Sequence, residues 1–214
     1  MDVITRARIG RVGILVSSLI WLVASVSFAS QVHARAADTD LAARAQPLGK
    51  PLDLILGFGE QFEYGDQLYD AKVAVVKVLR GGPAEALVKS ASASNPPAKA
   101  GLEYLAAKIH FEFTARVVLA RYDYTLDSSQ FTSISADGAA YPTPDLVAQP
   151  NPALHAAVRS GHSFEGWVVL LVPRSDRTPL MLFVPDADTT SHQGGSPVFR
   201  LYGAASLGSG SKSS

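Results

Sequence analysis

The segment Gly161-His162-Ser163-Phe164-Glu165-Gly166 comes nearest to a hydrolytic motif in this chain. A nucleophile elbow requires Gly-x-Ser-x-Gly between a strand and a helix, because a sharp turn must expose the serine hydroxyl. Here the second glycine comes one residue late, and strand-like residues follow it. We therefore expect Gly161 to supply a turn and Gly166 to allow a close backbone approach, and we assign no catalytic residue.

The histidines do not form a metal-binding motif. Their spacing is irregular, no His-x-x-x-His pair exists, and the chain contains 0 cysteines. A calcium loop also needs a glycine at its sixth position and a glutamate at its twelfth, and both are missing from the segment that begins at Asp186. We expect no metal and no cofactor. The histidines weighed for this were His110, His155, His162 and His192.

Glu60, Glu63 and Asp66 cluster as the carboxylates of a glycosidase would. General-acid catalysis requires one carboxyl group in an apolar pocket that raises its pKa. These three residues lie among glycines, which indicates a solvated turn instead. The sequence therefore favours a non-enzymatic protein.

Three tyrosines are candidates for partner contact, because aromatic side chains near strand ends often form binding surfaces. They are Tyr122, Tyr124 and Tyr141, and core packing is the alternative for at least one of them. We expect Trp167 to anchor the core of a sandwich. A pocket near His162 and Trp167 is the alternative that would suit a small molecule, a carbohydrate or a weak hydrolase.

The charge balance excludes some partners. The chain has 19 basic and 19 acidic residues, and its first 36 residues hold four Arg and one Asp, so the rest carries 15 basic and 18 acidic residues. Nucleic-acid binding needs a basic stripe that neutralises phosphates, and none is present in the sequence. No block of like charges indicates binding to an anionic membrane surface.

The N-terminus has the pattern of a secretory signal peptide. Arg6, Arg8 and Arg11 precede an uncharged run over 12–30, and small-residue triplets follow, with cleavage expected between Ser30 and Ala37. An uncleaved single-pass anchor over residues 1–36 is the alternative, since the run nearly reaches bilayer length. We expect a secreted or cell-envelope protein that meets the membrane only if this segment is retained.

The rest of the chain reads as one domain with flexible ends. We predict a linker over 37–57, in which the apolar patch Leu52 to Leu56 is an alternative first strand, a domain over 58–203, and a Gly/Ser tail over 204–214. Helical periodicity is limited to Pro83 to Ser90 and Pro152 to Arg159.

Alternation of apolar and polar residues dominates the domain. One parity of the segment Tyr104 to Ala115 is apolar, from Leu105 to Phe113, which is the two-residue period of a half-buried strand. A bulge near Val75 would keep both Lys72 and Lys77 in water. The run from Trp167 to Leu171 is apolar on both faces, which indicates a central strand or one whose outer face a loop covers.

Turn signals complete the fold prediction. Asp137-Gly138 lies between short strand-like runs, and prolines bound the later runs. Short strands with few helices predict an all-β fold, an antiparallel β-sandwich of about six to eight strands behind a helical signal segment.

The ordered set of these segments resembles a bacterial extracellular family, domain of unknown function 4352, over about Phe58 to Val184. The resemblance implies an immunoglobulin-like sandwich that is secreted or membrane-tethered, and it implies no catalytic residues. The continuous strand through Thr114 to Tyr124 departs from the family, which usually has an Asn turn there. The segments that carry the resemblance are Gly59 to Asp66, the Val-rich strand after it, the strand from Tyr104, Phe131 to Ile134 with Asp137-Gly138 and Tyr141, and Gly161 with Gly166 to Pro173.

These observations favour a non-enzymatic exported β-sandwich that binds an unknown envelope or extracellular protein. Loops on a rigid scaffold commonly carry binding, so we expect contacts from Gly81 to Gly101 and from Tyr141 to Gly161.

Overall fold

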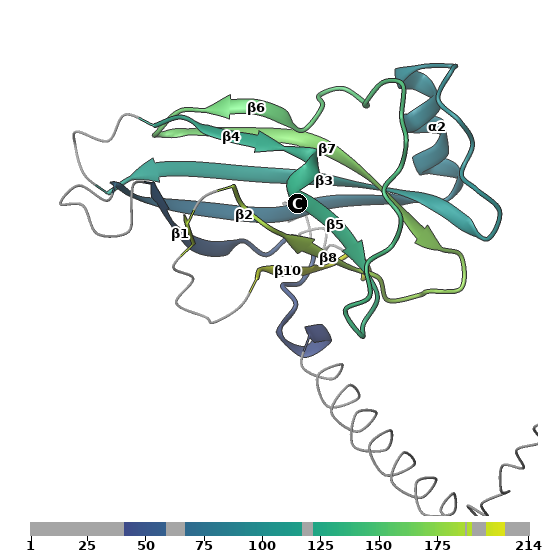
Figure 1. Ribbon diagram of the computed structural model, residues 1–214, viewed down its shortest axis with the longest axis horizontal. Coiled ribbons are helices and arrows are strands. Elements are labelled where there is room, and N and C mark those ends of the chain that lie inside the picture. The colour runs from purple at the N-terminus through teal and green to yellow at the C-terminus, as the bar shows by residue number, and fades with distance from the viewer. Residues whose placement is uncertain (1–40, 59–66, 117–121, 187, 190–195, 204–214) are drawn as a thin grey trace, which may run out of the picture. The chain divides into compact units, whose positions relative to one another are not determined.

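The computed structural model describes residues 41–58, 67–116, 122–186, 188–189 and 196–203 (Figure 1). The chain divides into units 1–36 and 37–214, and all described residues belong to the second. The predicted signal segment, the Gly/Ser tail, the carboxylate cluster at 60–66 and His192 lie outside the described residues. The described elements are β1 (Leu52–Phe58), β2 (Gln67–Arg80), α2 (Gly82–Ala91), β3 (Leu102–Ala115), β4 (Tyr124–Asp127), η1 (Ser128–Gln130), β5 (Phe131–Ile134), β6 (His155–Val158), β7 (His162–Pro173), β8 (Leu180–Phe183), β9 (Asp188–Thr189) and β10 (Val198–Arg200).

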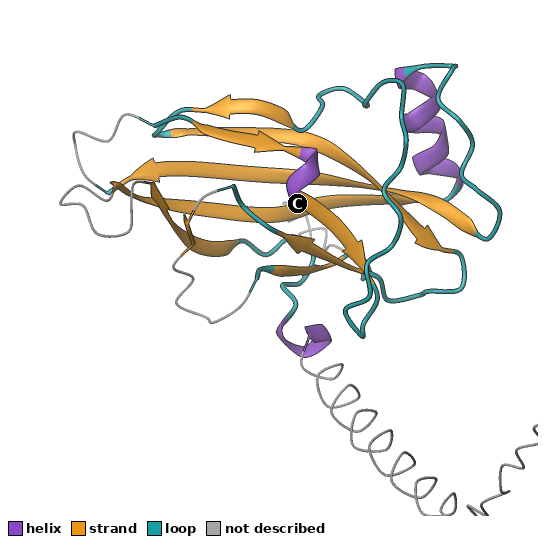
Figure 2. Ribbon diagram, viewed as in Figure 1, coloured by secondary structure: helices purple, strands orange, loops and turns teal. Residues whose placement is uncertain are grey.

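A five-stranded antiparallel sheet in the order β7-β3-β2-β1-β9 is the base of the fold (Figure 2). The alternation predicted for β3 is confirmed, because its apolar parity, from Leu105 to Phe113, is fully buried in the main core. The opposite parity carries Lys108, His110 and Glu112 on the outer face. The side-chain period of the strand therefore decides which face of the sheet is buried.

Two smaller sheets, β10-β8-β5 and β4-β6, cover the inner face of the large sheet. Phe111 of β3 stacks on Tyr124 of β4 at 4.9 Å, and Phe131 stacks on Phe183 at 4.6 Å within the second layer. The prediction of an all-β antiparallel sandwich is confirmed. The described residues form ten strands rather than six to eight, because β6, β9 and β10 are short segments without a long alternating run.

The bulge predicted near Val75 is confirmed. The β2–β3 register shifts between Val75 and Lys77, so that one extra residue lies in β2. Lys72 and Lys77 are both exposed as a result, although they stand on opposite parities of the sequence.

Strand β7 is buried on both faces, but it lies at the edge of the sheet and not at its centre. Val168, Leu170 and Val172 enter the main core, whereas Trp167 enters a second cluster with Ala84 and Val88 of α2. The central-strand alternative was therefore wrong, and the covered outer face is what the structure shows. Trp167 is 8% exposed, so it is a buried anchor, although it packs under α2 and not between the sheets.

The two helix candidates have different outcomes. The first is confirmed as α2, which starts with a proline in its first turn, where a missing N–H costs nothing. The second was wrong, because residues 155–158 form β6 and pair with β4. Tertiary pairing overrides the helical preference of the alanines in that segment.

The expected linker over 37–57 contains structure that belongs to the domain. β1 pairs with β2 along its whole length, from Leu52 opposite Val73 to Phe58 opposite Gln67. Before it, Ala45 is buried, and Gln46 exchanges backbone hydrogen bonds with Val198 and Arg200 at 2.8 and 2.9 Å. The domain thus starts before residue 58, and the alternative of a first strand at Leu52 to Leu56 is confirmed.

We predict that a chain starting at Gly49 is less stable than one starting at Ala37, by about 2 to 4 kcal/mol, because two backbone hydrogen bonds and the buried Ala45 are lost. Urea unfolding followed by the fluorescence of Trp167 measures the difference. Ala45→Glu in the longer chain should shift the midpoint in the same direction, because it places a charge in a closed apolar cluster. Equal midpoints for both chain lengths would show that residues 37–48 are a tether.

Candidate functional site

The two loops predicted to contact a partner are joined into one surface. We call this surface the cap, and it comprises α2, residues 92–101 and the loop 141–152. Its apolar side packs on the outer face of β3 and β7 through Val88, Trp167 and Leu146, among others. The cap is therefore a fixed part of the fold at one end of the large sheet (Figure 1).

Asn95 links the two halves of the cap. It is 1% exposed, and its Nδ2 donates to the carbonyl oxygens of Val88 and Ala148, both at 2.8 Å. The Ala148 N–H donates to Asn95 Oδ1 at 3.0 Å, so one buried amide side chain uses both its donor group and its acceptor. Tyr104 adds a hydrogen bond from its hydroxyl to the Pro96 carbonyl at 2.9 Å. Residues 90–101 are thus held by buried polar contacts and not only by their ends.

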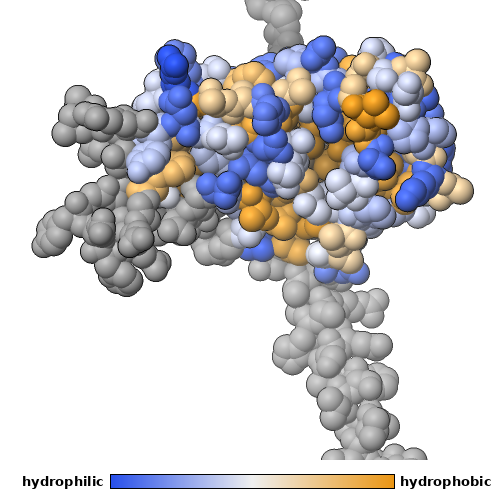
Figure 3. All heavy atoms as spheres, turned by 45° about the horizontal axis from the view of Figure 1, so that its top comes forward, coloured by the Kyte–Doolittle hydropathy of each residue, from blue (hydrophilic) through white to orange (hydrophobic). Residues whose placement is uncertain are grey.

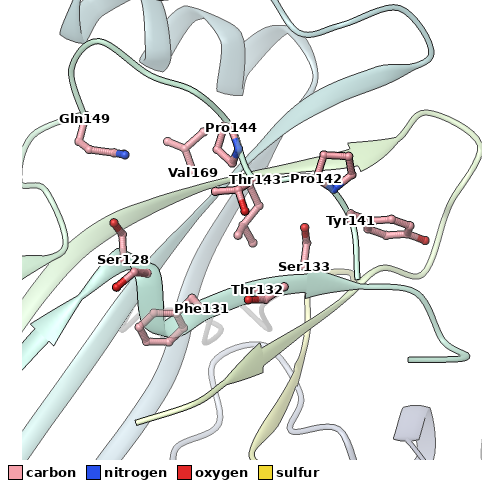
Figure 4. A pocket seen from close by; sticks show the side chains of 12 residues that line it. Ser128, Phe131, Thr132, Ser133, Tyr141, Pro142, Thr143, Pro144, Gln149 and Val169 are labelled. Carbon is pink, nitrogen blue, oxygen red and sulfur yellow. The ribbon is translucent and has the colours of Figure 1, made fainter. Parts of the chain in front are cut away.

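A cavity of about 220 Å³, which we call the slot, lies between the loop 141–149, η1 with β5, and the middle of β7 (Figure 4). That volume is about seven times the roughly 30 Å³ that one water molecule occupies in the liquid. No lining residue carries a formal charge. Its polar side chains are mainly hydroxyls, and Phe131, Pro142, Pro144 and the β7 residues Val169 and Leu170 also line it; the hydroxyl residues are Ser128, Ser129, Thr132, Ser133, Tyr141 and Thr143.

Gln149 is the unusual polar residue of the slot. Its Oε1 is buried without a hydrogen-bond partner among the described residues. Figure 4 shows its amide nitrogen pointing toward the middle of the slot. An unpaired buried amide oxygen costs about 1 to 3 kcal/mol of stability, so a residue of this kind needs a physical reason to be there. The amide nitrogen that faces the slot could donate to a carbonyl or hydroxyl oxygen of a ligand.

Tyr141, which lines the slot, is uncharged although it contacts the carboxylate of Asp176. The Tyr141 hydroxyl donates to Asp176 Oδ2 at 2.8 Å, and burial together with that carboxylate raises the pKa of Tyr141 to about 12. On the other side, the backbone N–H and hydroxyl of Ser129, with His155, lower the pKa of Asp127 below its ordinary value. The Tyr141 phenol is therefore a neutral group at physiological pH, and Asp127 is occupied in capping η1.

The three candidate contact tyrosines occupy different environments. Tyr124 is buried in the main core, where burial raises the pKa of its hydroxyl, in agreement with the core-packing alternative. Tyr122 is 48% exposed and stacks on Phe58 at 5.4 Å. Tyr141 lines the slot. The structure does not bring the three together into one surface, and only Tyr141 belongs to the site described here.

His162 and Ser163 do not form a nucleophile and base. They are neighbours on β7, so their side chains point to opposite faces, with Phe164 and Val168 marking the face of His162 and Trp167 marking that of Ser163. His162 lines a shallow depression with Arg159 and Ser163, and Trp167 does not line it. The expected pocket shared by His162 and Trp167 is therefore wrong, because five residues along a strand place two side chains on opposite faces.

The other described histidines, His110 and His155, contact carboxylates. His110 lies between Glu165 at 3.2 Å and Glu112 at 3.1 Å on the outer face of the large sheet, and Lys108 contacts Glu165 at 2.6 Å. Lys108 and His110 lower the pKa of Glu165. His155 contacts Asp127 at 2.7 Å. Within the described ranges, no three His, Asp or Glu side chains converge as metal ligands would.

Large apolar side chains are sparse on the described surface. Val147 in the cap is 70% exposed, and the other exposed large hydrophobic residues are Tyr122 and Val184. Figure 3 shows apolar and polar residues interspersed on the face turned toward the viewer. The surface of the cap is therefore not a broad apolar patch, and the slot is the feature with convergent polar groups.

Sequence reasoning missed the slot. The loop that borders the slot does carry a sequence signal, because its four prolines, at 142, 144, 150 and 152, indicate an extended, stiff segment. No local pattern marks Gln149 or Asn95, because their roles depend on residues far along the chain.

Comparisons with known proteins leave the family open. No protein-family model matches the chain, and no curated protein matches it. The crystal structure of a candidate lipoprotein (ycdA) of Bacillus subtilis is similar with a TM-score of 0.43 and 14% identity, covering 61% of this chain and 35% of that one. The chain thus spans about a third of the length of that protein, and the score carries no conclusion. The resemblance to domain of unknown function 4352 stays a prediction.

In the described part of the chain, no helix is both long enough and apolar enough to span a bilayer.

We predict that Asn95→Ala lowers the free energy of unfolding by about 2 to 4 kcal/mol, because three hydrogen bonds in a buried site lose their shared partner. Hydrogen exchange should show faster exchange of the Ala148 amide, since that N–H loses its acceptor. Ser94→Ala, at the exposed neighbouring position, is the matched control and should change neither quantity. Unchanged exchange at Ala148 would mean that the two halves of the cap are not coupled through Asn95.

We predict opposite effects for two matched glutamine substitutions. Gln149→Leu should leave the stability unchanged or raise it, because it removes an unpaired buried oxygen. Gln130→Leu should lower it by about 1 to 3 kcal/mol, because Gln130 is 8% exposed, accepts from the Asp127 N–H at 3.1 Å and donates to Thr125 at 3.1 Å. Chemical denaturation of both variants measures the difference. Loss of stability in Gln149→Leu would show that this amide serves the fold.

Proposed function

We propose that this protein is a non-enzymatic, exported binding module that recognises a partner of the cell envelope or extracellular space through the slot. The single observation that carries the proposal is the half-buried Gln149 side chain, whose Oε1 has no partner among the described residues and whose amide nitrogen faces an uncharged cavity. Stability alone does not favour such a residue, whereas binding does.

The surroundings of the slot support binding rather than catalysis. Catalysis needs a nucleophile, a base and oxyanion donors that converge on one point. The serine and histidine of the hydrolase-like segment diverge to opposite faces, and the hydroxyls of the slot have no histidine or carboxylate among the lining residues that would activate them. Ser133 Oγ already donates to the Leu171 carbonyl at 2.8 Å. A panel of esterase, peptidase and glycosidase substrates should therefore show no turnover.

Location and partner class follow from the sequence pattern. The basic and apolar N-terminal segment supports export, and the near-neutral balance of 19 basic and 19 acidic residues argues against nucleic acid as a partner. A protein of the envelope or surroundings is the favoured partner. A neutral saccharide is the second candidate, favoured by the hydroxyl side chains that line the slot.

The decisive experiment compares two threonine substitutions in chains that start at Ala37. Thr143 is exposed and points into the slot, so Thr143→Trp should fill it (Figure 4). Thr114→Trp, at an exposed position on the outer face of β3, is the matched control. Each immobilised protein is presented with envelope extract and with a saccharide array.

We expect the same protein partner to bind the unsubstituted chain and Thr114→Trp, and to be lost from Thr143→Trp. Slot-dependent binding of a saccharide instead would establish the second candidate. Binding that is equal for all three proteins, or turnover of any hydrolase substrate, would overturn the proposed function.

A further inference from the structure

The free edge of β7 is half occupied by the chain itself. The Trp167 N–H donates to the Pro152 carbonyl at 2.8 Å, and the Leu154 N–H donates to the Trp167 carbonyl at 3.1 Å. The backbone groups of Trp167 therefore point away from β3, although Trp167 lies opposite Lys108 in the β3–β7 register. The segment 152–154 covers the edge at this residue and does not continue along it.

Backbone groups further along the same edge point into the slot. Outward-pointing residues recur every second position in an antiparallel pair, and the β3–β7 register has no shift. The N–H and C=O of Val169 and those of Leu171 therefore face the same side as those of Trp167. Leu171 C=O accepts from Ser133 Oγ, whereas the outward groups of Val169 have no hydrogen-bond partner among the described residues. Val169 lines the slot.

The opposite wall of the slot is a second strand edge. The Phe183 N–H donates to the Pro197 carbonyl, away from β5, so the pair Phe131 and Phe183 exchanges no backbone hydrogen bonds. The backbone of Phe131 thus faces away from β8, its N–H donates to the Ser128 carbonyl, and its C=O has no partner among the described residues. Two strand edges therefore present unused backbone groups to one uncharged cavity.

We infer that the slot binds an extended, uncharged peptide segment of the partner, which adds to the edge of β7 by backbone hydrogen bonds to Val169; this inference rests on the proposed function. Strand addition is a common way for an exposed sheet edge to recognise a peptide, since main-chain groups give affinity and alternate side chains give specificity. Gln149 contributes an amide that pairs with a peptide group, and the Phe131 carbonyl is a further acceptor.

The lining also selects against charged side chains. A lysine or glutamate of the peptide would lose its hydration in the slot without an opposite charge among the lining residues. Serine, threonine and small apolar side chains suit the hydroxyls of β5 and η1 and the proline walls. The slot would thus recognise the main chain of the peptide and the absence of charged side chains.

The test starts from a displayed library of random hexapeptides that is selected on the chain from Ala37 and counter-selected on Thr143→Trp. The recovered peptides are synthesised unmodified and with an N-methyl group at each position in turn. N-methylation removes a backbone donor, so we expect at least a tenfold loss of affinity at the position whose N–H donates to the Val169 carbonyl. A second loss is expected where a peptide N–H donates to the Phe131 carbonyl, and little effect elsewhere, because the outward carbonyls of Trp167 and Leu171 already have partners.

Three further readouts and one control variant separate this mechanism from others. Gln149→Leu should weaken binding about tenfold without loss of stability, and a charged residue in the middle of the peptide should abolish binding. The Val169 amide should become protected from hydrogen exchange when the peptide binds, and Thr114→Trp should bind as the unsubstituted chain does.

Recovery of no slot-dependent peptide, or an N-methyl scan without any sensitive position, would overturn the inference. If the slot instead bound a saccharide or the folded surface of a partner, with loss in Thr143→Trp, the proposed function would stand while the peptide mechanism failed. Equal binding by Thr143→Trp and the unsubstituted chain would defeat both.

Discussion

The burial of one end of β3, residues 104–107, and of residues 167–172 of β7 on both faces is the constraint on which the rest of the structure depends. One face of the pair supplies Leu105, Phe111 and Val168 to the main core, and the other carries Trp167 and Leu171. Burying apolar surface of that extent stabilises the fold by roughly 25 cal/mol per Å². The sandwich covers the first face, so a second layer, the cap, has to cover the other. Helix α2 and the loop 141–152 exist in this position for that reason.

The cap in turn creates the slot. A loop that crosses the outer face of a sheet brings backbone amides into a buried place, and Asn95 satisfies those of Ala148. The loop then descends to pair with Trp167 at the edge of β7. Residues 141–144 and Gln149 of the same loop stand opposite η1 and β5, and the slot is the space between them. The attachments hold this loop in place, which limits the entropy that the loop would lose when a ligand binds.

Neutrality distinguishes the slot from the rest of the surface. The outer face of the large sheet carries a ladder of opposite charges through Lys108, Glu165 and His110, which is solvated and contributes little to stability. The slot has hydroxyls, an amide and backbone groups instead. Hydrogen bonding without charge suits an extended main chain, whose donors and acceptors are themselves neutral. Specificity then depends on what the slot excludes as much as on what it binds.

The sequence by itself determined the class of fold, the phase of β3, the bulge at Val75 and the two apolar faces of β7, because side-chain period and bulges are local properties of a strand. It also indicated α2 through its proline start. Only the tertiary structure decided that β7 is an edge strand, that residues 45–57 belong to the domain and that His162 and Trp167 diverge. The slot, Asn95 and the unpaired Gln149 were out of reach for the same reason. Each depends on which distant segments lie beside it. The approach of β5, β7 and the loop 141–149 to one cavity is a long-range outcome that no local pattern encodes.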